Sequence, residues 1–435
     1  MNINYDLITL IMTAVTAVMI VFVLCLSIYY LCFWSVSAKK VEPVPHSDKL
    51  TKFAVLIAAR NESKVIDHIL ESLKNQTYPR DSFEVYAIVE KESDPTVEIV
   101  QKYGFKYFVR DRLMDGRRTK GFAIQECIDY FWRNNIQYDS YMIFDADNIL
   151  APTYLEVMND LRQTGVKVGL GFRNFTNANT NWLTVGSSVM FAYMNDVTSK
   201  GRTNLFHKAT LMGTGYYVDD DIIRDAGGWI FTGMTEDIQL TTYCYYHDIY
   251  MRYYPLVCFY DEQSPEFKTV HAQHVRWLYG YFQRRDFLKG VGVQHDYHSS
   301  QMQSFMRFEF NVGLLPFVIF NCVMGISAII NLVFGSIATF YVGPEQYGFL
   351  FGIAAFQFLL IYVSFALPAF ITILRANDRI NLTTKNKIIG VLTYMFFFYE
   401  FVLAFFDGAI HPKKRTTWTR IKHTGQITNK DLLKK

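Results

Sequence analysis

Long stretches without a charged side chain constrain this chain more than any other feature. Residues 7–34 contain no Asp, Glu, Lys or Arg, and three later apolar runs cover 312–342, 347–374 and 388–406. A helix needs roughly 20 apolar residues to cross a bilayer, and in lipid it satisfies its backbone groups internally. The runs therefore predict transmembrane helices on both sides of a more polar middle part.

Changes in composition divide the chain into five predicted parts. They are an N-terminal transmembrane helix at 1–38, a cytoplasmic domain at 50–278, amphipathic helices on the membrane surface at 279–310, further transmembrane helices at 311–408 and a basic tail at 409–435. Basic residues directly after the first run place the middle part in the cytoplasm of a multi-pass protein of the cell membrane. A signal peptide is not expected, because the run is too long and no Lys or Arg precedes it.

The sequence leaves the number of crossings open. One span before the polar part and three after it would place both termini outside, whereas the basic tail favours the cytoplasmic side. The run at 312–342 is long for one crossing, and the run at 388–406 is short and contains Glu400. Glu400 is either a functional group in the membrane or a packed, neutral carboxyl group.

The overall composition excludes several classes of protein. Of the 435 residues, 51% are hydrophobic and 19% are charged, and the formal net charge is +3. A typical soluble domain is about 25% charged, so the chain is neither disordered nor purely soluble. The net charge is too small for a dedicated nucleic-acid binder, and six Cys without a CxxC pair argue against a zinc module or a disulfide scaffold.

The polar middle part alternates between strand-like and helix-like segments. Buried strands are predicted at 53–59, 83–89 and 140–144, and helices at 65–73, 95–103 and 120–131. This alternation predicts an α/β domain with a parallel sheet and helices on both faces. Sheets of this kind bind ligands beyond the carboxyl ends of their strands.

Two acidic motifs stand where such a ligand would bind. Asp145-Ala146-Asp147 follows the third predicted strand, and two carboxylates at one sheet edge suit Mg²⁺ or Mn²⁺ on a diphosphate. Thr235-Glu236-Asp237 could supply a general base. The alternatives are a solvated turn for the first motif and, for the second, a helix start that Thr235 caps.

A third motif combines a cation with an indole. Within Gln273-His274-Val275-Arg276-Trp277, Arg276 can clamp a diphosphate and Trp277 offers a flat face to a sugar ring. The alternative is an aromatic group at the membrane interface beside a snorkelling Arg. His271 and His274 form an HxxH pair, but the sequence shows no third metal ligand.

Taken together and in this order, the short motifs resemble those of one enzyme family. They are Ala59-Arg60-Asn61-Glu62, the acids Glu90, Glu92 and Asp94, Lys120-Gly121, the Asp-Ala-Asp motif, Gly213-Thr214-Gly215, the Thr-Glu-Asp motif and the Gln-His-Val-Arg-Trp motif. The set is similar to that of the membrane-embedded family 2 glycosyltransferases, which include cellulose, hyaluronan, poly-N-acetylglucosamine and chitooligosaccharide synthases. The resemblance covers about residues 53–277.

The resemblance implies a fold, a donor and a set of site residues. It implies an α/β GT-A glycosyltransferase domain, with a mixed, mostly parallel sheet, inserted between transmembrane α-helices. It also implies a UDP-sugar donor and Mg²⁺ or Mn²⁺. The implied donor-nucleotide residues are Asn61, Glu62, Glu90, Lys120 and Asp145; the metal residues are Asp145 and Asp147; the diphosphate and acceptor residues are Gly213, Thr214, Gly215, Gln273, Arg276 and Trp277; and the catalytic residues are Asp237, as general base, with Glu236 and Thr235.

Three functions are weighed on this basis. The first is an inverting enzyme that polymerises a hexose from a UDP-sugar into a β-linked polysaccharide and couples synthesis to secretion. The second is a non-processive relative that adds one sugar to a membrane lipid. The third, from another class, is a transporter or scaffold without catalysis, which would not need acidic motifs at strand ends. The expected partners are a UDP-sugar, a glycan or lipid-linked acceptor and membrane lipids.

Overall fold

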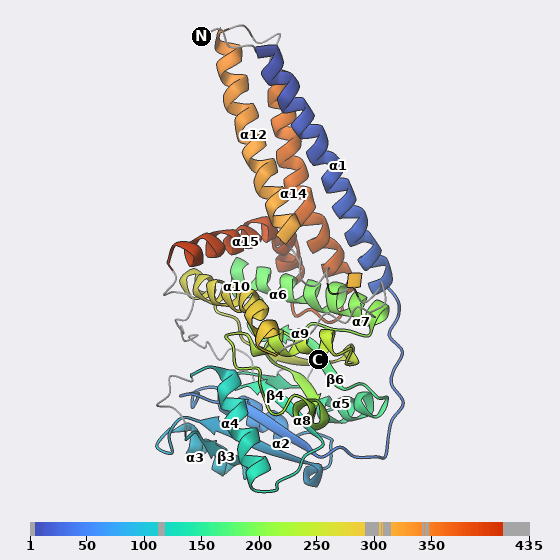
Figure 1. Ribbon diagram of the computed structural model, residues 1–435, viewed down its shortest axis with the longest axis vertical. Helices are drawn as coiled ribbons and strands as arrows, with labels where there is room; N and C mark the ends of the chain where they lie inside the picture. Colours follow the sequence, from blue (N-terminus) through green and yellow to red (C-terminus); the bar gives the residue numbers. More distant parts are fainter. Residues whose placement is uncertain are drawn as a thin grey trace.

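The computed structural model describes residues 5–111, 118–291, 304–305, 307, 315–341, 343 and 348–411. A mixed α/β domain lies at one end of this part of the chain, and long apolar helices extend from it at the other (Figure 1).

The described residues form one mixed sheet in the order β3-β2-β1-β4-β7-β6-β8-β5. Its strands are β1 (Phe53–Ala58), β2 (Phe83–Val89), β3 (Lys106–Val109), β4 (Ser140–Asp145), β5 (Ile149–Leu150), β6 (Val168–Phe175), β7 (Tyr216–Asp219) and β8 (Met251–Asp261). β1 runs parallel to both β2 and β4, whereas β7 runs antiparallel to β4 and β6. Ala58 lies opposite both Ile88 and Asp145, so the carboxyl ends of three neighbouring strands share one edge.

Helices cover both faces of the sheet, as the sequence predicts. They are α2 (Ile66–Lys74), α3 (Thr96–Lys102), α4 (Lys120–Arg133), α5 (Tyr154–Gln163), α6 (Trp182–Tyr193), α7 (Lys200–Phe206), α8 (Asp220–Asp225), α9 (Glu236–Tyr246) and α10 (Phe267–Gly290), with the short helices η1 (Arg80–Ser82) and η3 (Met194–Ser199). Alternate residues of β1 enter two separate cores. Ala54 and Leu56 belong to the core that includes α4, α6 and α9, and Val55 and Ile57 to the core that includes α2, α3 and α5.

The predicted strands and helices at 53–59, 65–73, 83–89, 95–103, 120–131 and 140–144 are observed close to these bounds as β1, α2, β2, α3, α4 and β4. The predicted boundary at 278/279 falls inside α10, which continues to Gly290. Most of the predicted surface helices beyond this point, and the basic tail from residue 412, lie outside the described residues.

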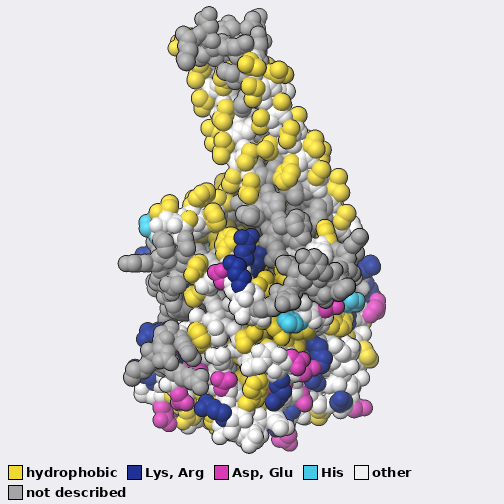
Figure 2. Space-filling view, in the orientation of Figure 1, with side chains coloured by type: hydrophobic (Ala, Val, Ile, Leu, Met, Phe, Trp, Pro, Cys, Tyr) yellow, Lys and Arg dark blue, Asp and Glu magenta, His cyan; other side chains and the backbone are white. Residues whose placement is uncertain are grey.

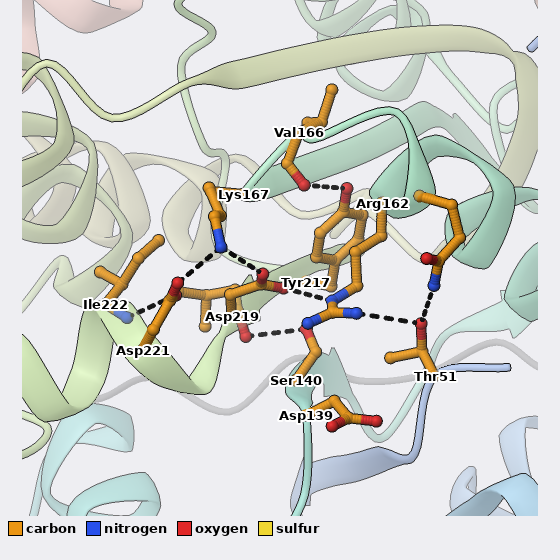
Figure 3. A network of polar contacts seen from close by, with 12 residues as sticks. Thr51, Asp139, Ser140, Arg162, Val166, Lys167, Tyr217, Asp219, Asp221 and Ile222 are labelled. Carbon is orange, nitrogen blue, oxygen red and sulfur yellow. Dashed lines mark hydrogen bonds and ion pairs between the residues drawn. The ribbon is translucent and has the colours of Figure 1, made fainter. Parts of the chain in front are cut away.

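A network of charged side chains ties the sheet together at the amino end of β4 (Figure 3). Asp219 is almost completely buried and accepts from Arg162 Nε at 2.6 Å and Lys167 Nζ at 3.3 Å. Arg162 Nη1 also donates to Thr51 Oγ1 at 3.4 Å. Burial raises the pKa of Asp219, and the two cations oppose that rise. The network fixes β7 against the chain that enters β1, at the end of β4 remote from Asp145.

Among the residues that the structure describes, the apolar part consists of four long helices: α1 (Tyr5–Ser37), α12 (Leu315–Tyr341), α14 (Phe349–Arg375) and α15 (Thr384–Ile410). Among the described residues, the stretches long and apolar enough to cross a membrane are Asn321–Tyr341, Phe349–Arg375 and Thr384–Ile410, and all of them follow the sheet. The prediction that the sheet domain is inserted between transmembrane helices is therefore corrected. Within α1, the apolar stretch that can be described is Thr13–Phe22. These ten residues are too few to cross a membrane by themselves.

The long helices pack on one another through buried polar side chains. Gln357 of α14 donates to Thr16 Oγ1 of α1 at 3.0 Å and to Ser327 Oγ of α12 at 3.1 Å, and accepts from Asn331 Nδ2 at 3.0 Å. The outer surface is apolar, and on the visible face of Figure 2 hydrophobic side chains cover the bundle. Polar groups inside and apolar groups outside are the arrangement expected of helices in lipid.

The last helix, α15, has a different position. In Figure 1 it lies across the lower end of the bundle, crosswise to α12 and α14, and over α6 and α10. Small residues allow these close contacts: a Cβ atom on Gly186 of α6 would lie 2.5 Å from Phe397, and one on Gly408 of α15 would lie 3.2 Å from Val275. The composition of α15 would permit a crossing, yet this helix packs against the sheet domain.

Candidate active site

The Asp-Ala-Asp motif follows β4 directly and is held by the Gly213–Gly215 turn. The Asp145 N–H donates to Thr214 Oγ1 at 2.9 Å and to Asn148 Oδ1 at 3.1 Å, and the Thr214 hydroxyl donates to Asn148 Oδ1 at 2.5 Å. Thr214 is buried, so its role here is to join two loops. Gly215 lies at φ +70°, and a Cβ atom there would meet the Phe259 ring at 2.1 Å, which explains why glycine is needed at this position.

Lys120, at the start of α4, connects the two acidic motifs. Its Nζ atom lies 2.5 Å from Asp145 Oδ1 and 3.9 Å from Glu236 Oε1, and it donates to the Gly213 carbonyl at 2.8 Å. Burial alone would lower the pKa of Lys120, but the carboxylates of Asp145 and Glu236 more than offset this and raise it. Lys120 is therefore a charged ammonium at the centre of the site.

The Thr-Glu-Asp motif begins α9, as the helix-start alternative predicts. Thr235 is the N-cap residue, but its side chain makes no capping hydrogen bond, so that part of the alternative is wrong. Glu236 and Asp237 are both buried. Burial raises the pKa of both carboxyl groups, opposed by the charge on Lys120 and, for Asp237, by backbone hydrogen bonds from Ile238 and Gly213.

The Gln-His-Val-Arg-Trp motif lies on α10, which packs against α9. Burial lowers the pKa of the Arg276 guanidinium, and the carboxylates of Glu236, Asp145 and Asp237 oppose this shift. Arg276 therefore faces the same acidic cluster as Lys120. A Cβ atom on Gly280 would lie 2.4 Å from Thr235 Oγ1, so α10 touches the Thr-Glu-Asp motif directly, one turn beyond Trp277. Trp277 is half-buried, with its ring edge-on to Phe191 of α6 at 6.1 Å.

The segment after β1 approaches the acids that follow β2. Asn61 has a left-handed backbone, with φ +57°, and its N–H donates to Asp94 Oδ2 at 2.9 Å. Glu90 pairs with Arg60 at 3.2 Å, and Glu62 is half-buried at the same edge. Asp94 thus orders the turn that carries Asn61 and Glu62. The sequence did not show which of the three acids after β2 would make this contact.

The structure also adds residues that the sequence motifs missed. Arg173 of β6 is buried; its Nε donates to Asp261 Oδ2 at 3.0 Å, and its Nη1 donates to the Met212 carbonyl at 2.5 Å. Asp261 Oδ1 in turn accepts from Asn148 Nδ2 at 3.3 Å. This chain of contacts supports both the Asp-Ala-Asp turn and the Gly213–Gly215 turn from behind. The pattern gave no signal for it because its members lie 25 to 113 residues apart.

The donor set at the Asp-Ala-Asp motif fits a hard divalent cation. Asp145 and Asp147 contribute carboxylate oxygens, and Mg²⁺ is usually bound by one or two carboxylates together with substrate phosphates. Groups of three or more His, Cys, Asp or Glu suited to a metal are absent from the described residues. The protein would therefore share the metal with the diphosphate.

The structure brings Lys120, Asp145, Gly213 and Glu236 together where β4 ends, and it brings Asn61 to Asp94 where β1 and β2 end. A cavity of about 410 Å³ lies elsewhere, between β8 and the 378–381 segment, and none of the predicted site residues lines it. The site at the end of β4 combines the partly buried Lys120 and the buried Arg276 with a carboxylate pair suited to a metal and a second, buried carboxylate pair. These groups suit the transfer of a group whose leaving portion carries several negative charges.

A family model described as glycosyltransferase-like family 2 matches residues 51–280, more than half of the chain. The chain therefore belongs to glycosyltransferase family 2 and is a glycosyltransferase. It is 29% identical over 240 residues to the probable glycosyltransferase YdaM of Bacillus subtilis, covering 53% of this chain and 56% of that protein. It is 27% identical over 240 residues to a beta-monoglucosyldiacylglycerol synthase of Trichormus variabilis, covering 53% and 49%.

A poly-beta-1,6-N-acetyl-D-glucosamine synthase of Staphylococcus epidermidis is 24% identical over 230 residues, covering 52% of this chain and 53% of that protein. The chain thus spans about half the length of the curated relatives it matches. A solved mannosyltransferase from Pyrobaculum calidifontis, in complex with GDP-Man and Mn²⁺, has a TM-score of 0.54 at 15% identity, covering 92% of this chain and 99% of that one. This likeness confirms a GT-A-like sheet domain followed by apolar helices.

Proposed function

We propose that the protein is an inverting glycosyltransferase that transfers a hexose from a UDP-sugar to a hydroxyl group of an acceptor at the membrane. One observation carries this proposal: Lys120 joins Asp145 and Glu236 at the carboxyl edge of the sheet, where Arg276 faces the same acids. A partly buried ammonium and a buried guanidinium beside carboxylates suit a leaving diphosphate.

Each side chain has a separate role in this proposal. Asp237 removes the proton from the acceptor hydroxyl as its oxygen attacks the anomeric carbon, and its burial favours proton uptake. Lys120 and Arg276 stabilise the charge that develops on the diphosphate. A single displacement inverts an α-linked donor to a β-glycoside. Gln273 and Trp277 then bind the acceptor beside Arg276, and Asn61, Glu62 and Glu90 bind the nucleoside.

Asp145 and Asp147 would hold Mg²⁺ or Mn²⁺ in this scheme, and the metal would supply charge neutralisation on the diphosphate when bound. Mn²⁺ is present in the solved mannosyltransferase complex that shares the fold.

We favour a membrane lipid as the acceptor. The acceptor subsite on α10 lies next to α15, and α15 connects the sheet domain to the apolar bundle (Figure 1). Secretion of a polymer would need a passage between helices, whereas Gln357, Thr16, Ser327 and Asn331 fill the contact between α1, α12 and α14. The monoglucosyldiacylglycerol synthase relatives support this choice.

Processive polysaccharide synthesis is the second candidate. The likeness to poly-beta-1,6-N-acetyl-D-glucosamine synthase favours it, as does the complete set of motifs. A transporter or scaffold finds no comparable support, because the cations and acids form a site suited to catalysis.

The test is UDP release by the purified protein in lipid nanodiscs with Mn²⁺, using UDP-glucose, UDP-N-acetylglucosamine and UDP-glucuronate singly and in pairs. Radiolabel that extracts into organic solvent with a small lipid would support the lipid acceptor. Label in long polymer would support the second candidate instead. If no donor released UDP above the level of an Asp237→Asn control, the proposed function would be wrong.

A further inference from the structure

A buried cluster of ionisable side chains joins α10 to α15. Glu400 of α15 is 1% exposed, and its two carboxylate oxygens meet two histidines of α10: Oε1 lies 2.8 Å from His271 Nδ1, and Oε2 is in contact with His274 Nδ1. Asp407, two turns further along α15, lies 3.1 Å from His271 Nε2. We call these four side chains, His271, His274, Glu400 and Asp407, the clamp. Its paired residues are 126 to 136 positions apart in sequence.

The two histidines are held in different ways. Both ring nitrogens of His271 lie within hydrogen-bond distance of carboxyl oxygens, so this ring is held at both edges. His274 needs a proton only on Nδ1, and burial lowers its pKa, which favours the neutral ring. Its ring stacks on Phe401 with centroids 3.7 Å apart. Both oxygens of Glu400 thus meet histidines of α10, whereas Asp407 meets His271 of α10 with one oxygen and His411, at the end of α15, with the other at 2.8 Å.

The clamped helix also carries the diphosphate and acceptor residues. His274 and Arg276 are two residues apart on the same helix, so the contact that fixes the rotation of α10 at His274 also fixes the direction in which Arg276 leaves the helix. On the next turns, Gly280 packs against Thr235, where a Cβ atom would lie 2.4 Å from Oγ1. A shift of α10 would therefore move both Arg276 and the start of α9.

We propose that Glu400 and Asp407 are positioning residues for glycosyl transfer: through His271 and His274 they fix the rotation and depth of α10, and thereby the place of Arg276 in the active site. This proposal rests on the proposed function. It makes α15 a structural support of the catalytic centre.

The first test compares Glu400→Gln, which keeps the shape and removes the charge, with Asp286→Asn on the exposed side of α10. We expect kcat for UDP release to fall about tenfold or more in Glu400→Gln, since a small misplacement of a catalytic group has effects of this size. Asp286→Asn should retain the wild-type rate. A Glu400→Gln rate within about twofold of wild type would overturn the proposal.

The histidine gives a matched pair of variants. His274→Gln can still donate a hydrogen bond to Glu400, and we expect it to stay within about threefold of the wild-type kcat, whereas His274→Phe keeps the ring on Phe401 but removes the donor and should lose about tenfold. Equal effects of the two variants would mean that ring packing alone matters and would overturn the proposal.

A double-mutant cycle separates positioning from general destabilisation. If Glu400 acts through Arg276, Arg276→Lys should cost about tenfold less in the Glu400→Gln background than in the wild type, because coupled residues are not additive. Additive effects would contradict the proposal.

Hydrogen exchange keeps this result distinct from the proposed function. In Glu400→Gln, the amides of α10 should exchange faster than in the wild type, whereas those of α4 should not change. Unchanged exchange in α10 would overturn the inference even in a protein without measurable turnover. Absence of UDP release from the wild type, with the exchange difference present, would overturn only the proposed function.

Discussion

At the scale of single residues, one ammonium sets the charge of the site. Lys120 lies within ion-pair distance of Asp145 and Glu236, and its charge opposes the rise in pKa that burial imposes on Glu236 and Asp237. The two neighbouring acids of α9 are coupled, so their titration belongs to the pair. The balance between burial and Lys120 decides at which pH the proposed base is free to accept a proton.

A pH profile tests this balance. Protonation of Asp237 removes the base, so kcat/KM should fall as the pH falls, with a midpoint above the ordinary carboxyl range because burial raises the pKa of both acids. In Lys120→Met the opposing charge is gone, and the acid limb should move to still higher pH. Rates of UDP release between pH 4 and 9 measure the limb; an unchanged limb in Lys120→Met would refute this account.

Two glycines of one turn provide a matched comparison. Both have positive φ, but a Cβ atom on Gly215 would meet Phe259 at 2.1 Å, whereas one on Gly213 meets nothing within 4 Å. Gly213→Ala should therefore cost only the conformational strain, roughly 1–2 kcal/mol, and Gly215→Ala distinctly more, because it also displaces the ring. Thermal unfolding in detergent compares them, and equal losses would argue against the contact.

Sequence patterns predicted most of the candidate site residues, but not the buried residues that hold them in place. Asp145, Asp147 and Lys120 were predicted because strand ends and short motifs are local signals. Arg173 and Asp261 were missed because they are 88 residues apart in sequence. Their strands, β6 and β8, are neighbours only in the folded sheet, so the buried ion pair leaves no local sequence pattern. Thr235 was expected to be a possible cap, and it occupies the cap position while its hydroxyl, pressed against Gly280, makes no capping bond.

At the scale of secondary-structure elements, α10 is the central connection of the enzyme. It contacts α9 on one side and α15 on the other, so the acidic motif, the cationic motif and the apolar part share one helix. Hydrophobic periodicity predicted α2, α3 and α4 well, because each covers one face of the sheet. The sequence analysis predicted helices from residue 279 onward, but it placed a domain boundary at 278/279, where α10 is continuous from Phe267 to Gly290.

The contact between α10 and α9 can be tested with one methyl group. Gly280→Ala places a Cβ atom 2.4 Å from Thr235 Oγ1, so the helices must separate by part of an ångström. We expect kcat for UDP release to fall about tenfold or more. Gly290→Ala, at the open end of the same helix with nothing within 4 Å, is the control and should be neutral. A neutral Gly280→Ala would show that this contact does not position the acidic motif.

At the scale of the whole molecule, the apolar runs were predicted from composition, but composition could not assign their roles. Length and hydropathy treat α14 and α15 alike, although α15 packs on α6 and α10 of the sheet domain. The deciding features are Glu400 and the small residues that permit close contact.

The polar contact inside the bundle should contribute to stability and not to catalysis. Gln357→Leu leaves the hydrogen-bonding groups of Asn331, Thr16 and Ser327 without their shared partner. We expect a loss of roughly 1–2 kcal/mol in resistance to unfolding in detergent, with the rate of UDP release per folded molecule unchanged. Ser336→Ala is the control, because that hydroxyl bonds only to Leu332 of its own helix among the described groups. A large change in rate would link the bundle to the active site.

The clamp between α10 and α15 also bears on how the enzyme is made. The ribosome releases the whole sheet domain long before residues 400 and 407, so a nascent chain can fold its nucleotide site while Arg276 still lacks the support of the last helix. Full activity would begin only after that helix has emerged and packed against α10. Truncated products of translation that lack α15 would then transfer sugar more slowly than the full chain.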